Sequence, residues 1–518
     1  MARLGLLLPL LVLAGPLPGC LHAPRAAPPA PAPAAAVAPL APLPPRPWAD
    51  EVLYFVLVDR FVDGDPGNDR QVDRAAKGAF HGGDLKGLTE QLDEIVSLGV
   101  TAIWINPLVK NIDLPVTGAG FPDWAYHGYW ADDFTRIDPR FGTEEELAAL
   151  VRACHARGVR VLLDVVYNHA GYNSAYLRDP KVRGYFRTEC GDDDLTACLS
   201  GLPDFETERP EVRDFLIGAQ LPWARRFGLD GFRLDTVKHV DHDFWQVHRR
   251  RVDAELGRDF FLLGEVWGGD KDVLDPWFAG RELDAGFDFG FQGSTLGWLM
   301  GRGRSIAFGR YLETRHRVRD GRLLSHYLSS HDVEGGLGQL GGDRVRFRLA
   351  VALQLTTAGL PMIYYGEEVG RAIGKWPENR SDMPWGEKGL LPGAGVPRDE
   401  GMRAWYRRLI AVRRAHPALS HGGHATLSAE GDLLVFLRLD QPSGDAVVVA
   451  VNRGDAEASA LLERPAAWGA APPEELLGSA RLEPEANRLR LTLPPRSAAI
   501  VQAGANPGRP RYIRPRSE

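Results

Sequence analysis

The sequence predicts an α/β protein: a (β/α)8 TIM barrel with a short subdomain inserted after strand 3, followed by a C-terminal antiparallel β-sandwich. Three observations predict this fold. Eight continuous apolar runs alternate with amphipathic stretches, about 40 extra residues follow the third run, and the helical pattern stops near residue 420. Continuous apolar strands separated by helices are typical of a parallel sheet buried on both faces. A chain of 518 residues also exceeds a single core of about 250–300 residues.

The first 47 residues are not expected to join a core. Arg3 precedes the apolar run Leu6–Ala14, which is too short to span a bilayer and is typical of an export signal covering residues 1–20. The signal ends in Leu-Pro-Gly-Cys20, which resembles the bacterial lipobox, so we expect Cys20 to carry a lipid. Pro18 is atypical of that motif, and plain secretion is the alternative. Residues 21–47 hold ten prolines and ten alanines and predict an extended spacer.

The catalytic barrel is expected over residues 48–420. Its eight strands are predicted at Leu53–Val58, Ala102–Ile105, Val159–Val166, Gly231–Leu234, Phe260–Gly264, Leu283–Phe289, His326–Ser330 and Met362–Tyr365. Helices are predicted between them, for example Val212–Phe227, which Gly228 closes.

Spacing predicts the inserted subdomain. Asp164 and Asp235 are 71 residues apart, whereas one strand-helix repeat takes about 30. The surplus falls at about residues 170–206. Cys190 and Cys198 lie in this segment, and an exported protein meets an oxidising compartment, so we expect a disulfide between them, with two free thiols as the alternative. Cys154 lies in a helical pattern and is expected to be a buried thiol.

The last part of the chain has a strand-like pattern. Strands are predicted at Leu433–Arg438, Ala446–Asn452, Leu489–Leu493 and Ala498–Gln502, which places the sandwich at residues 421–503. The tail, residues 504–518, is rich in proline and arginine and is expected to fray.

The overall composition is that of a folded protein with no polyanion partner. Hydrophobic residues make up 44% of the chain, charged residues 25%, and the formal charge is −7. A negative chain gives no electrostatic reason to bind nucleic acid. No other stretch is long and apolar enough for a membrane helix, so we expect membrane contact only through the N-terminal lipid, on the periplasmic or cell-surface side. We expect a monomer.

Polar residues gather where the predicted barrel strands end. Asp164 and His169 follow the third strand, Arg233 and Asp235 the fourth, Glu265 the fifth, and His331 and Asp332 the seventh. The C-terminal ends of the strands form the active face of such a barrel. Cleaving a glycosidic bond requires two carboxyl groups, one of which must have a raised pKa to act as an acid. The pattern therefore predicts a barrel hydrolase, although a metal-dependent barrel hydrolase could use the same residue types.

Longer strings narrow this prediction. The chain resembles glycoside hydrolase family 13, the α-amylase family, in seven ordered segments: Tyr126-His-Gly-Tyr-Trp130, Asp164-Val-Val-Tyr-Asn-His169, Leu202-Pro-Asp-Phe205, Gly231-Phe-Arg-Leu-Asp-Thr-Val-Lys-His239, Gly264-Glu-Val-Trp267, Ser330-His-Asp332 and Gly359-Leu-Pro-Met-Ile-Tyr-Tyr-Gly-Glu367.

The resemblance implies a role for each matching residue. Asp235 matches the nucleophile, Glu265 the general acid/base, and Asp332 the carboxylate that holds the distorted sugar and helps to keep the acid protonated. Arg233 would orient Asp235 and lower its pKa. The remaining substrate-binding residues implied are His127, Tyr129, Trp130, Asp164, His169, Lys238, His239, Trp267 and His331.

The resemblance also implies calcium, which prefers oxygen ligands. Asn168, Asp204 and the carbonyl of His239 match the family's site between barrel and inserted subdomain. A second, N-terminal calcium loop is implied by the likeness to cyclodextrin glucanotransferases; its residues are Asp63, Asp65, Asn68, Asp69, Gly82 and Asp84.

Within the family, Lys238-His239 after the nucleophile is the pattern of α-amylases and cyclodextrin glucanotransferases. Only about 100 residues follow position 420, too few for the extra domains of the glucanotransferases, and no N-terminal sandwich precedes the barrel. We therefore expect an α-amylase that cleaves α-1,4 bonds in starch or maltodextrin. Ser330 occurs in the neopullulanase-like branch, so a maltogenic, neopullulanase-like or transglycosylating amylase is the alternative. A non-catalytic glucan-binding protein of the same fold is a second, more remote alternative.

Overall fold

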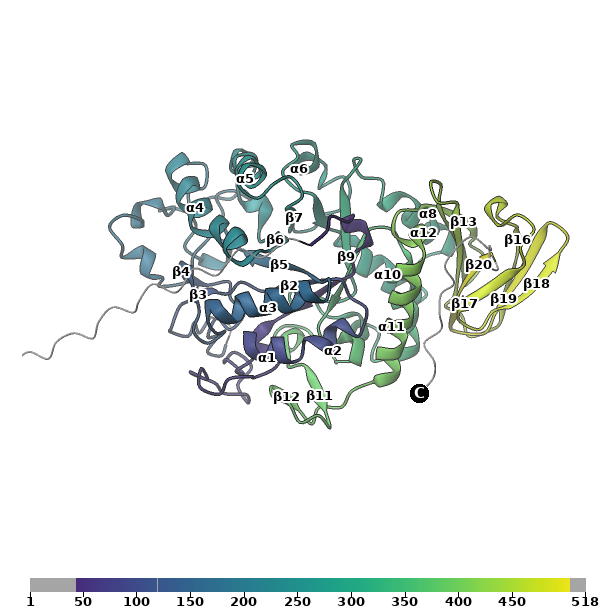
Figure 1. Cartoon of the computed structure of the whole chain (residues 1–518), viewed down its shortest axis with the longest axis horizontal. Helices are drawn as coiled ribbons and strands as arrows, with labels where there is room; N and C mark the ends of the chain where they lie inside the picture. The colour runs from purple at the N-terminus through teal and green to yellow at the C-terminus, as the bar shows by residue number, and fades with distance from the viewer. Residues whose placement is uncertain (1–42, 119, 504–518) are drawn as a thin grey trace, which may run out of the picture. The chain divides into compact units, whose positions relative to one another are not determined.

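The computed structural model describes residues 43–118 and 120–503 (Figure 1). The predicted export signal, Cys20, most of the spacer and the tail lie outside the described residues. The end of the spacer already packs on the barrel: Arg46 pairs with Glu51 at 2.5 Å and donates hydrogen bonds to the carbonyls of Thr101 and Gly158. No helix in the described part of the chain combines the length and apolarity needed to cross a bilayer.

Eight parallel strands form a closed barrel in the order β1-β2-β5-β6-β7-β8-β9-β10, with β10 pairing back to β1. Their bounds are β1 Leu53–Val56, β2 Ala102–Ile105, β5 Arg160–Val165, β6 Gly231–Leu234, β7 Phe261–Gly264, β8 Ala285–Phe287, β9 Leu323–Tyr327 and β10 Leu360–Tyr364. Nearly every side chain on these strands is buried, as expected for a sheet that has helices on one face and the barrel core on the other. The predicted barrel is confirmed.

The predicted seventh strand, His326–Ser330, was wrong by three residues. The strand begins at Leu323 and ends at Tyr327, because the following serines bond to the turn instead of extending the sheet. Ser329 Oγ accepts the N–H of Gly336 at 3.2 Å, and Ser330 Oγ accepts the N–H of Asp332 at 3.1 Å. Asp332 therefore lies on a loop beyond the strand end.

Twelve α-helices are assigned in the described residues: α1 Leu85–Glu90, α2 Leu92–Val96, α3 Glu144–Ala156, α4 Pro210–Phe227, α5 His242–Glu255, α6 Asp275–Ala279, α7 Gly290–Leu299, α8 Ser305–Arg315, α9 Gly336–Gln339, α10 Arg344–Thr356, α11 Glu400–Ala415 and α12 Pro417–Ser420. Their ends follow the sequence signals. Thr143 and Glu146 form a capping box before α3, and α4 starts at a proline and ends at Gly228 with a φ of 67°.

The long segments that follow the barrel strands include one predicted excursion and one that was not predicted. The predicted one spans residues 166–209 after β5 and contains the short 3₁₀ turns η3 Ala175–Leu177, η4 Arg183–Tyr185 and η5 Leu199–Gly201. It holds the Cys190–Cys198 disulfide, while Cys154 is free and buried.

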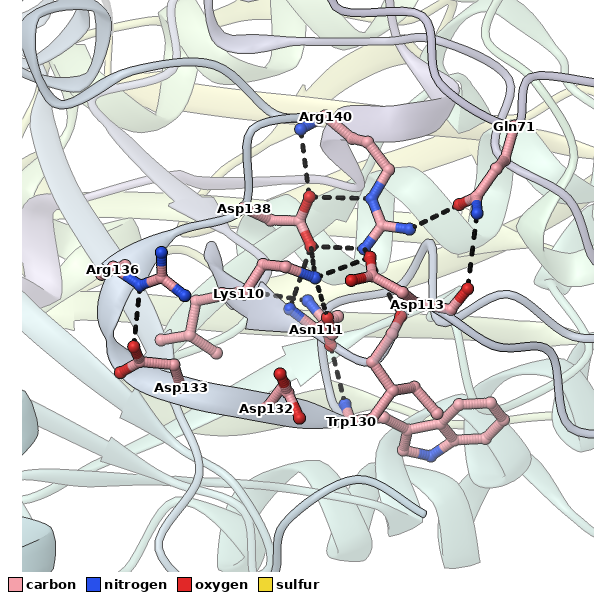
Figure 2. A network of polar contacts seen from close by, with 12 residues as sticks. Gln71, Lys110, Asn111, Asp113, Trp130, Asp132, Asp133, Arg136, Asp138 and Arg140 are labelled. Carbon is pink, nitrogen blue, oxygen red and sulfur yellow. Dashed lines mark hydrogen bonds and ion pairs between the residues drawn. The ribbon is translucent and has the colours of Figure 1, made fainter. Parts of the chain in front are cut away.

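The second excursion is the antiparallel hairpin of β3 Val109–Asn111 and β4 Ala131–Ile137, which the sequence did not predict. Figure 2 shows the polar network at its base. Buried Asp138 accepts hydrogen bonds from Arg140 at 2.6 and 2.8 Å and from the Asn111 N–H at 2.9 Å. Asn111 Oδ1 in turn accepts the N–H of Trp130 at 3.0 Å. This network fixes the loop that leads into Trp130.

The C-terminal region is a two-sheet antiparallel sandwich. One sheet has the order β13-β14-β15-β20-β17 and the other β16-β19-β18. The bounds are β13 Gly423–Ser428, β14 Leu433–Asp440, β15 Asp445–Asn452, β16 Ala458–Glu463, β17 Pro473–Leu477, β18 Arg481–Glu485, β19 Arg488–Leu493 and β20 Ser497–Ala503; a small pair, β11 Pro384–Gly386 and β12 Gly393–Ala394, precedes them. All four predicted strands are present, and Val448, Leu491 and Trp468 lie in the core between the sheets.

Candidate active site

Asp235 and Glu265 stand directly beyond β6 and β7. The Asp235 N–H donates to the carbonyl of Val165 at 3.0 Å, and the Glu265 N–H to that of Leu234 at 2.9 Å, so the backbone pairing of the barrel continues through both residues. Thr236 follows with a φ of 49°, a left-handed conformation that non-glycine residues adopt mainly where the site requires it. This conformation directs its N–H to Glu265 Oε2 at 3.0 Å.

Arg233 contacts three carboxyl groups of the site. Its Nη1 donates to Asp235 Oδ1 at 2.8 Å and to Asp164 Oδ2 at 3.0 Å, and its Nη2 lies 3.0 Å from Glu265 Oε2. The guanidinium is buried and therefore poorly screened by water. One cation thus holds three carboxyl groups, with the two proposed reacting groups on its two ends.

Glu265 is suited to act as an acid. Its burial raises its pKa to about 8, and the negative charges of Asp235 and Asp332 act in the same direction, against the opposing charge of Arg233. A carboxyl group with this pKa is protonated near neutral pH, whereas an ordinary glutamic acid is ionised.

Asp332 has the opposite electrostatic setting. It accepts a hydrogen bond from Arg380 Nη2 at 3.2 Å, and its other oxygen lies 3.1 Å from His331 Nε2. Burial alone would raise the pKa of Asp332, but the contact with His331 and the charges of Arg380 and Arg233 hold it below the ordinary value. Asp332 is therefore the ionised third carboxylate.

The three predicted sugar-binding histidines, His127, His169 and His331, are buried. Burial lowers the pKa of His127 and His169 below the ordinary value and that of His331 to about 3. They are neutral imidazoles, each able to donate one hydrogen bond and accept another. His127 Nδ1 accepts the Tyr129 N–H at 3.1 Å, which leaves Nε2 to carry the proton.

Tyr129 joins the histidines to Asp164. Its ring stacks on His331 at a centroid distance of 5.5 Å and an interplanar angle of 8°, and its hydroxyl donates to Asp164 Oδ2 at 2.8 Å. The same oxygen accepts from Trp104 Nε1 at 3.1 Å. Asp164 is 1% exposed, and its contacts fix Arg233 and Tyr129.

Lys238 and His239 contact the disulfide loop. Lys238 Nζ lies 3.1 Å from an Asp194 carboxylate oxygen, and His239 Nδ1 lies 2.6 Å from the Asp194 carbonyl oxygen. Trp267 is 50% exposed and rests against Phe289 at 5.0 Å. The Cys190–Cys198 loop thus forms one wall beside Lys238-His239.

The first predicted calcium site contains two buried oxygens without a hydrogen-bond partner, Asn168 Oδ1 and Asp204 Oδ1. His169 and Asp204 form an isolated β-bridge, which places the two segments side by side. Burial raises the pKa of Asp204 to about 6, although Arg187 binds its other oxygen at 3.1 Å. These oxygens fit a hard cation such as Ca²⁺.

The N-terminal loop has the same character. Asp63 Oδ1, Asn68 Oδ1 and Asp69 Oδ1 are buried and unpartnered. A Cβ at Gly82 would lie 2.4 Å from Asp69 Oδ1, so only glycine permits this approach. Asp84 also caps α1: it accepts from the N–H groups of Asp65 at 2.8 Å and Gly87 at 2.7 Å.

Arg74 pairs with Asp63 at 2.7 Å and supplies part of the positive charge in this loop. Within the described ranges, no three His, Cys, Asp or Glu side chains are arranged as a metal site by themselves. Any calcium here would need amide and carbonyl oxygens as well.

Three residues at the site were not predicted from the sequence: Arg380, Trp104 and Thr236. Arg380 lies 48 residues beyond Asp332, in the 3₁₀ turn η8 Glu378–Arg380, and no strand-end pattern marks it. Trp104 stands one position before the end of β2 in an apolar run, so it is indistinguishable from a core residue until its Nε1 is seen to bond Asp164.

A parallel eightfold barrel with an acid of raised pKa, a partner carboxylate held by a buried arginine and a third ionised carboxylate defines a glycoside hydrolase. The family described as the alpha amylase catalytic domain matches residues 55–189 and 186–384, and the maltogenic amylase C-terminal domain matches residues 425–500. The chain belongs to the α-amylase family, glycoside hydrolase family 13, whose members act on α-glucans.

Known relatives share most of the chain. It is 32% identical to a cyclomaltodextrinase of a Bacillus species over 80% of this chain and 74% of that protein. It is 30% identical to the periplasmic alpha-amylase of Escherichia coli over 74% and 69% of the two chains. The crystal structure of an Anoxybacillus alpha-amylase superposes with a TM-score of 0.78 and 29% identity, covering 89% of this chain and 100% of the other.

Proposed function

We propose that the protein is an α-amylase that hydrolyses α-1,4-glucosidic bonds in starch or maltodextrin with retention of configuration. The observation that carries the proposal is the pairing of Asp235 and Glu265 with opposite ends of the Arg233 guanidinium, at 2.8 and 3.0 Å. One carboxyl group is thereby oriented as a nucleophile, while the other is kept protonated by burial and neighbouring charge.

The reaction proceeds in two steps. Glu265 donates its proton to the glycosidic oxygen as Asp235 attacks the anomeric carbon, which releases the leaving sugar and forms a glycosyl ester with Asp235. Glu265, now ionised, then removes a proton from water, and this water cleaves the ester. Direct attack by Asp235 requires the short carboxyl separation of retaining enzymes, about 5–5.5 Å, and not the roughly 6.5–9.5 Å that inverting enzymes use.

Neutral histidines and one ionised carboxylate hold the sugar that is cut. His127, His169 and His331 bind its hydroxyl groups, Tyr129 provides the stacking ring, and Asp332 grips two hydroxyls of the distorted ring. These hydrogen bonds are preorganised and strengthen as the sugar ring flattens. They therefore lower the activation free energy of the reaction, and the site does not have to reorganise at the moment of reaction. Trp130, Lys238, His239 and Trp267 bind neighbouring sugar units.

Two groups of relatives support two candidates for the linkage that is cut and the product that is formed. The Anoxybacillus alpha-amylase is matched over its whole length, and the Escherichia coli relative is also named an alpha-amylase. The cyclomaltodextrinase match and the C-terminal domain shared with maltogenic amylases favour the second candidate, a maltogenic or neopullulanase-like amylase. Both candidates share the same carboxylates and the same chemistry.

We also propose two calcium ions, with structural roles. One would be held by Asn168, Asp204 and the His239 carbonyl, and the other by Asp63, Asp65, Asn68, Asp69, the Gly82 carbonyl and Asp84. The unpartnered buried oxygens in each group support this assignment. When bound, Ca²⁺ would neutralise these oxygens and hold the inserted segment and the N-terminal loop against the barrel.

The proposed setting is outside the cytoplasm, through lipidation of Cys20, with the folded part acting as a monomer. Replacing Cys20 by alanine should release the protein from the membrane fraction; an unchanged membrane fraction would exclude the anchor.

Timed chromatography of products from starch, pullulan and cyclodextrin tests the function. An α-amylase releases a range of maltooligosaccharides from starch before maltose accumulates, whereas the second candidate cleaves cyclodextrin and pullulan faster than starch. Proton NMR of the first products should show the α-anomer. Early β-anomer would mean inversion and contradict the mechanism.

A further inference from the structure

Trp376 is one of the few large apolar side chains that remain open in the described structure, with 43% of its surface exposed. It lies four residues before Arg380, the residue that binds Asp332 at 3.2 Å. One face of its indole is covered by Phe121, whose ring centroid is 5.3 Å away at an angle of 24°. Stacking of this kind leaves the opposite face of the indole for a ligand.

Phe121 is fixed from behind. A Cβ at Gly78 would lie 2.8 Å from two carbons of the Phe121 ring, so the ring packs directly on the glycine backbone. Phe121 also lies two residues before buried Asp123, whose carboxylate is 3.9 Å from His127 Nε2. The backing ring is therefore attached to the segment that supplies His127.

Trp376 is attached to the other wall of the site. Asn379 Nδ2 donates to the His331 carbonyl at 2.7 Å, and Arg380 Nε donates to the same oxygen at 3.0 Å. Tyr364, at the end of β10, donates its hydroxyl to the Asn379 carbonyl at 2.9 Å. The turn that begins at Trp376 thus has little freedom relative to Asp332.

We propose that Trp376, backed by Phe121, is a stacking platform for a glucosyl unit of the bound α-glucan, and this inference rests on the proposed function. The platform binds the part of the glucan that stays attached to Asp235, beyond the sugar that is cut. Both supports of the platform lead to groups proposed to hold that sugar.

The chemistry of a glucan suits such a surface. A pyranose ring presents a flat face of C–H groups, and an aromatic face buries it while leaving the sugar hydroxyls at the edge in water. Loss of one such contact lowers binding by about tenfold. The ligand class is therefore an α-linked glucan long enough to extend beyond the cleaved sugar on this side.

The test compares Trp376→Ala, Trp376→Leu and Trp376→Phe with wild type. Leucine keeps apolar bulk without a flat face, and phenylalanine keeps the flat face. Leu461→Ala, an exposed apolar side chain on the sandwich, is the matched control. Circular dichroism and thermal melting establish that each variant is folded. The measured quantity is the ratio of kcat/KM for 4-nitrophenyl α-maltoheptaoside to that for 4-nitrophenyl α-glucoside, whose single sugar does not extend beyond the position that is cut.

The ratio should fall about tenfold in the alanine and leucine variants and stay within about threefold in the phenylalanine variant. Calorimetric titration with maltoheptaose, in the Asp235→Asn background, should show the same loss of affinity. A ratio and affinity within twofold of wild type in both non-aromatic variants would overturn the platform. Wild type that cleaves neither substrate would instead contradict the proposed function, so the two failures are distinguishable.

Discussion

Arg233 Nη2 lies 3.0 Å from Glu265 Oε2 at the C-terminal end of the barrel, and both side chains are almost completely shielded from water. A buried guanidinium would by itself favour the ionised carboxylate. Burial of Glu265 and the charges of Asp235 and Asp332 outweigh it, and the pKa of Glu265 rises to about 8. The acid is protonated mainly because it is buried, and the neighbouring carboxylates act in the same direction.

The first prediction concerns pH. Because Glu265 must be protonated to act as the acid, kcat/KM should fall as pH rises through about 8. Glu265→Gln should lose at least about a hundredfold of kcat/KM on maltoheptaoside. It should retain far more activity on α-maltosyl fluoride, whose fluoride departs without a proton. Equal losses on both substrates would show that Glu265 is not the acid.

The same shift predicts a change in stability. The pKa of Glu265 is higher in the folded chain than in the unfolded chain, where it is about 4.3. Its contribution is therefore fully present below about pH 4.3 and is lost as pH rises towards 8. Glu265→Gln does not ionise and should melt at a higher temperature than wild type at pH 8, with the difference shrinking at pH 5. A difference that grows on acidification would contradict the assigned shift.

The second prediction tests the hairpin network in Figure 2. Asp138 is fully buried and Arg140 nearly so. Asp138→Ala leaves that guanidinium without its carboxylate and should cost about 3–5 kcal/mol of stability.

Asp133→Ala is the matched control on β4, because its partner Arg136 is exposed. It should cost less than about 1 kcal/mol. The readout is the urea midpoint of each variant. Equal midpoints for the two variants would exclude a structural role for the buried pair.

The third prediction concerns the disulfide loop. Opening the bridge in Cys190→Ser/Cys198→Ser removes a constraint worth about 2–3 kcal/mol on a short loop, so the loop that holds Lys238 through Asp194 should become mobile. Limited proteolysis should cut the loop faster, and KM for starch should rise.

Asp194→Ala removes the Lys238 contact and keeps the bridge. It therefore separates the effect of losing this contact from the effect of opening the disulfide. A double variant with wild-type KM and wild-type protease resistance would show that the loop is held by other contacts.

The fourth prediction concerns calcium. Chelation should lower the melting temperature, because an ion that binds only the folded chain at 100 times its Kd stabilises it by about 2.7 kcal/mol. Asn68→Ala/Asp69→Ala should melt at a lower temperature than wild type in excess calcium and should lose part of the response to chelator. Asp214→Ala, at an exposed carboxylate, is the control and should respond as wild type does. A melting temperature that chelator leaves unchanged in wild type would exclude both ions.

Sequence patterns could predict the parts of the fold that follow local rules. The barrel strands are apolar runs, and Asp235 and Glu265 are the first charged residues after two of them, so alternation and spacing place both at one barrel end. The seventh strand was misplaced because Ser329 and Ser330 look permissive in a strand but bond to the turn.

Features that depend on contacts distant in sequence could not be predicted. Arg380 reaches Asp332 only because η8 is bonded to the carbonyl of His331. The β3–β4 hairpin has a polar, irregular sequence, and its order comes from the buried Asp138–Arg140 pair. Trp376 is an ordinary loop tryptophan until Phe121, more than 250 residues earlier, is seen to stack against it.

Trapping the covalent intermediate tests the central assignment most directly. 5-Fluoro-α-maltosyl fluoride should react by loss of fluoride and leave a slowly hydrolysed glycosyl ester, which peptic digestion and mass spectrometry can locate. We expect the label on the peptide that contains Asp235, no label in Asp235→Asn, and at least about a thousandfold lower kcat in that variant. A label on another carboxylate, or near-normal turnover by Asp235→Asn, would contradict that assignment.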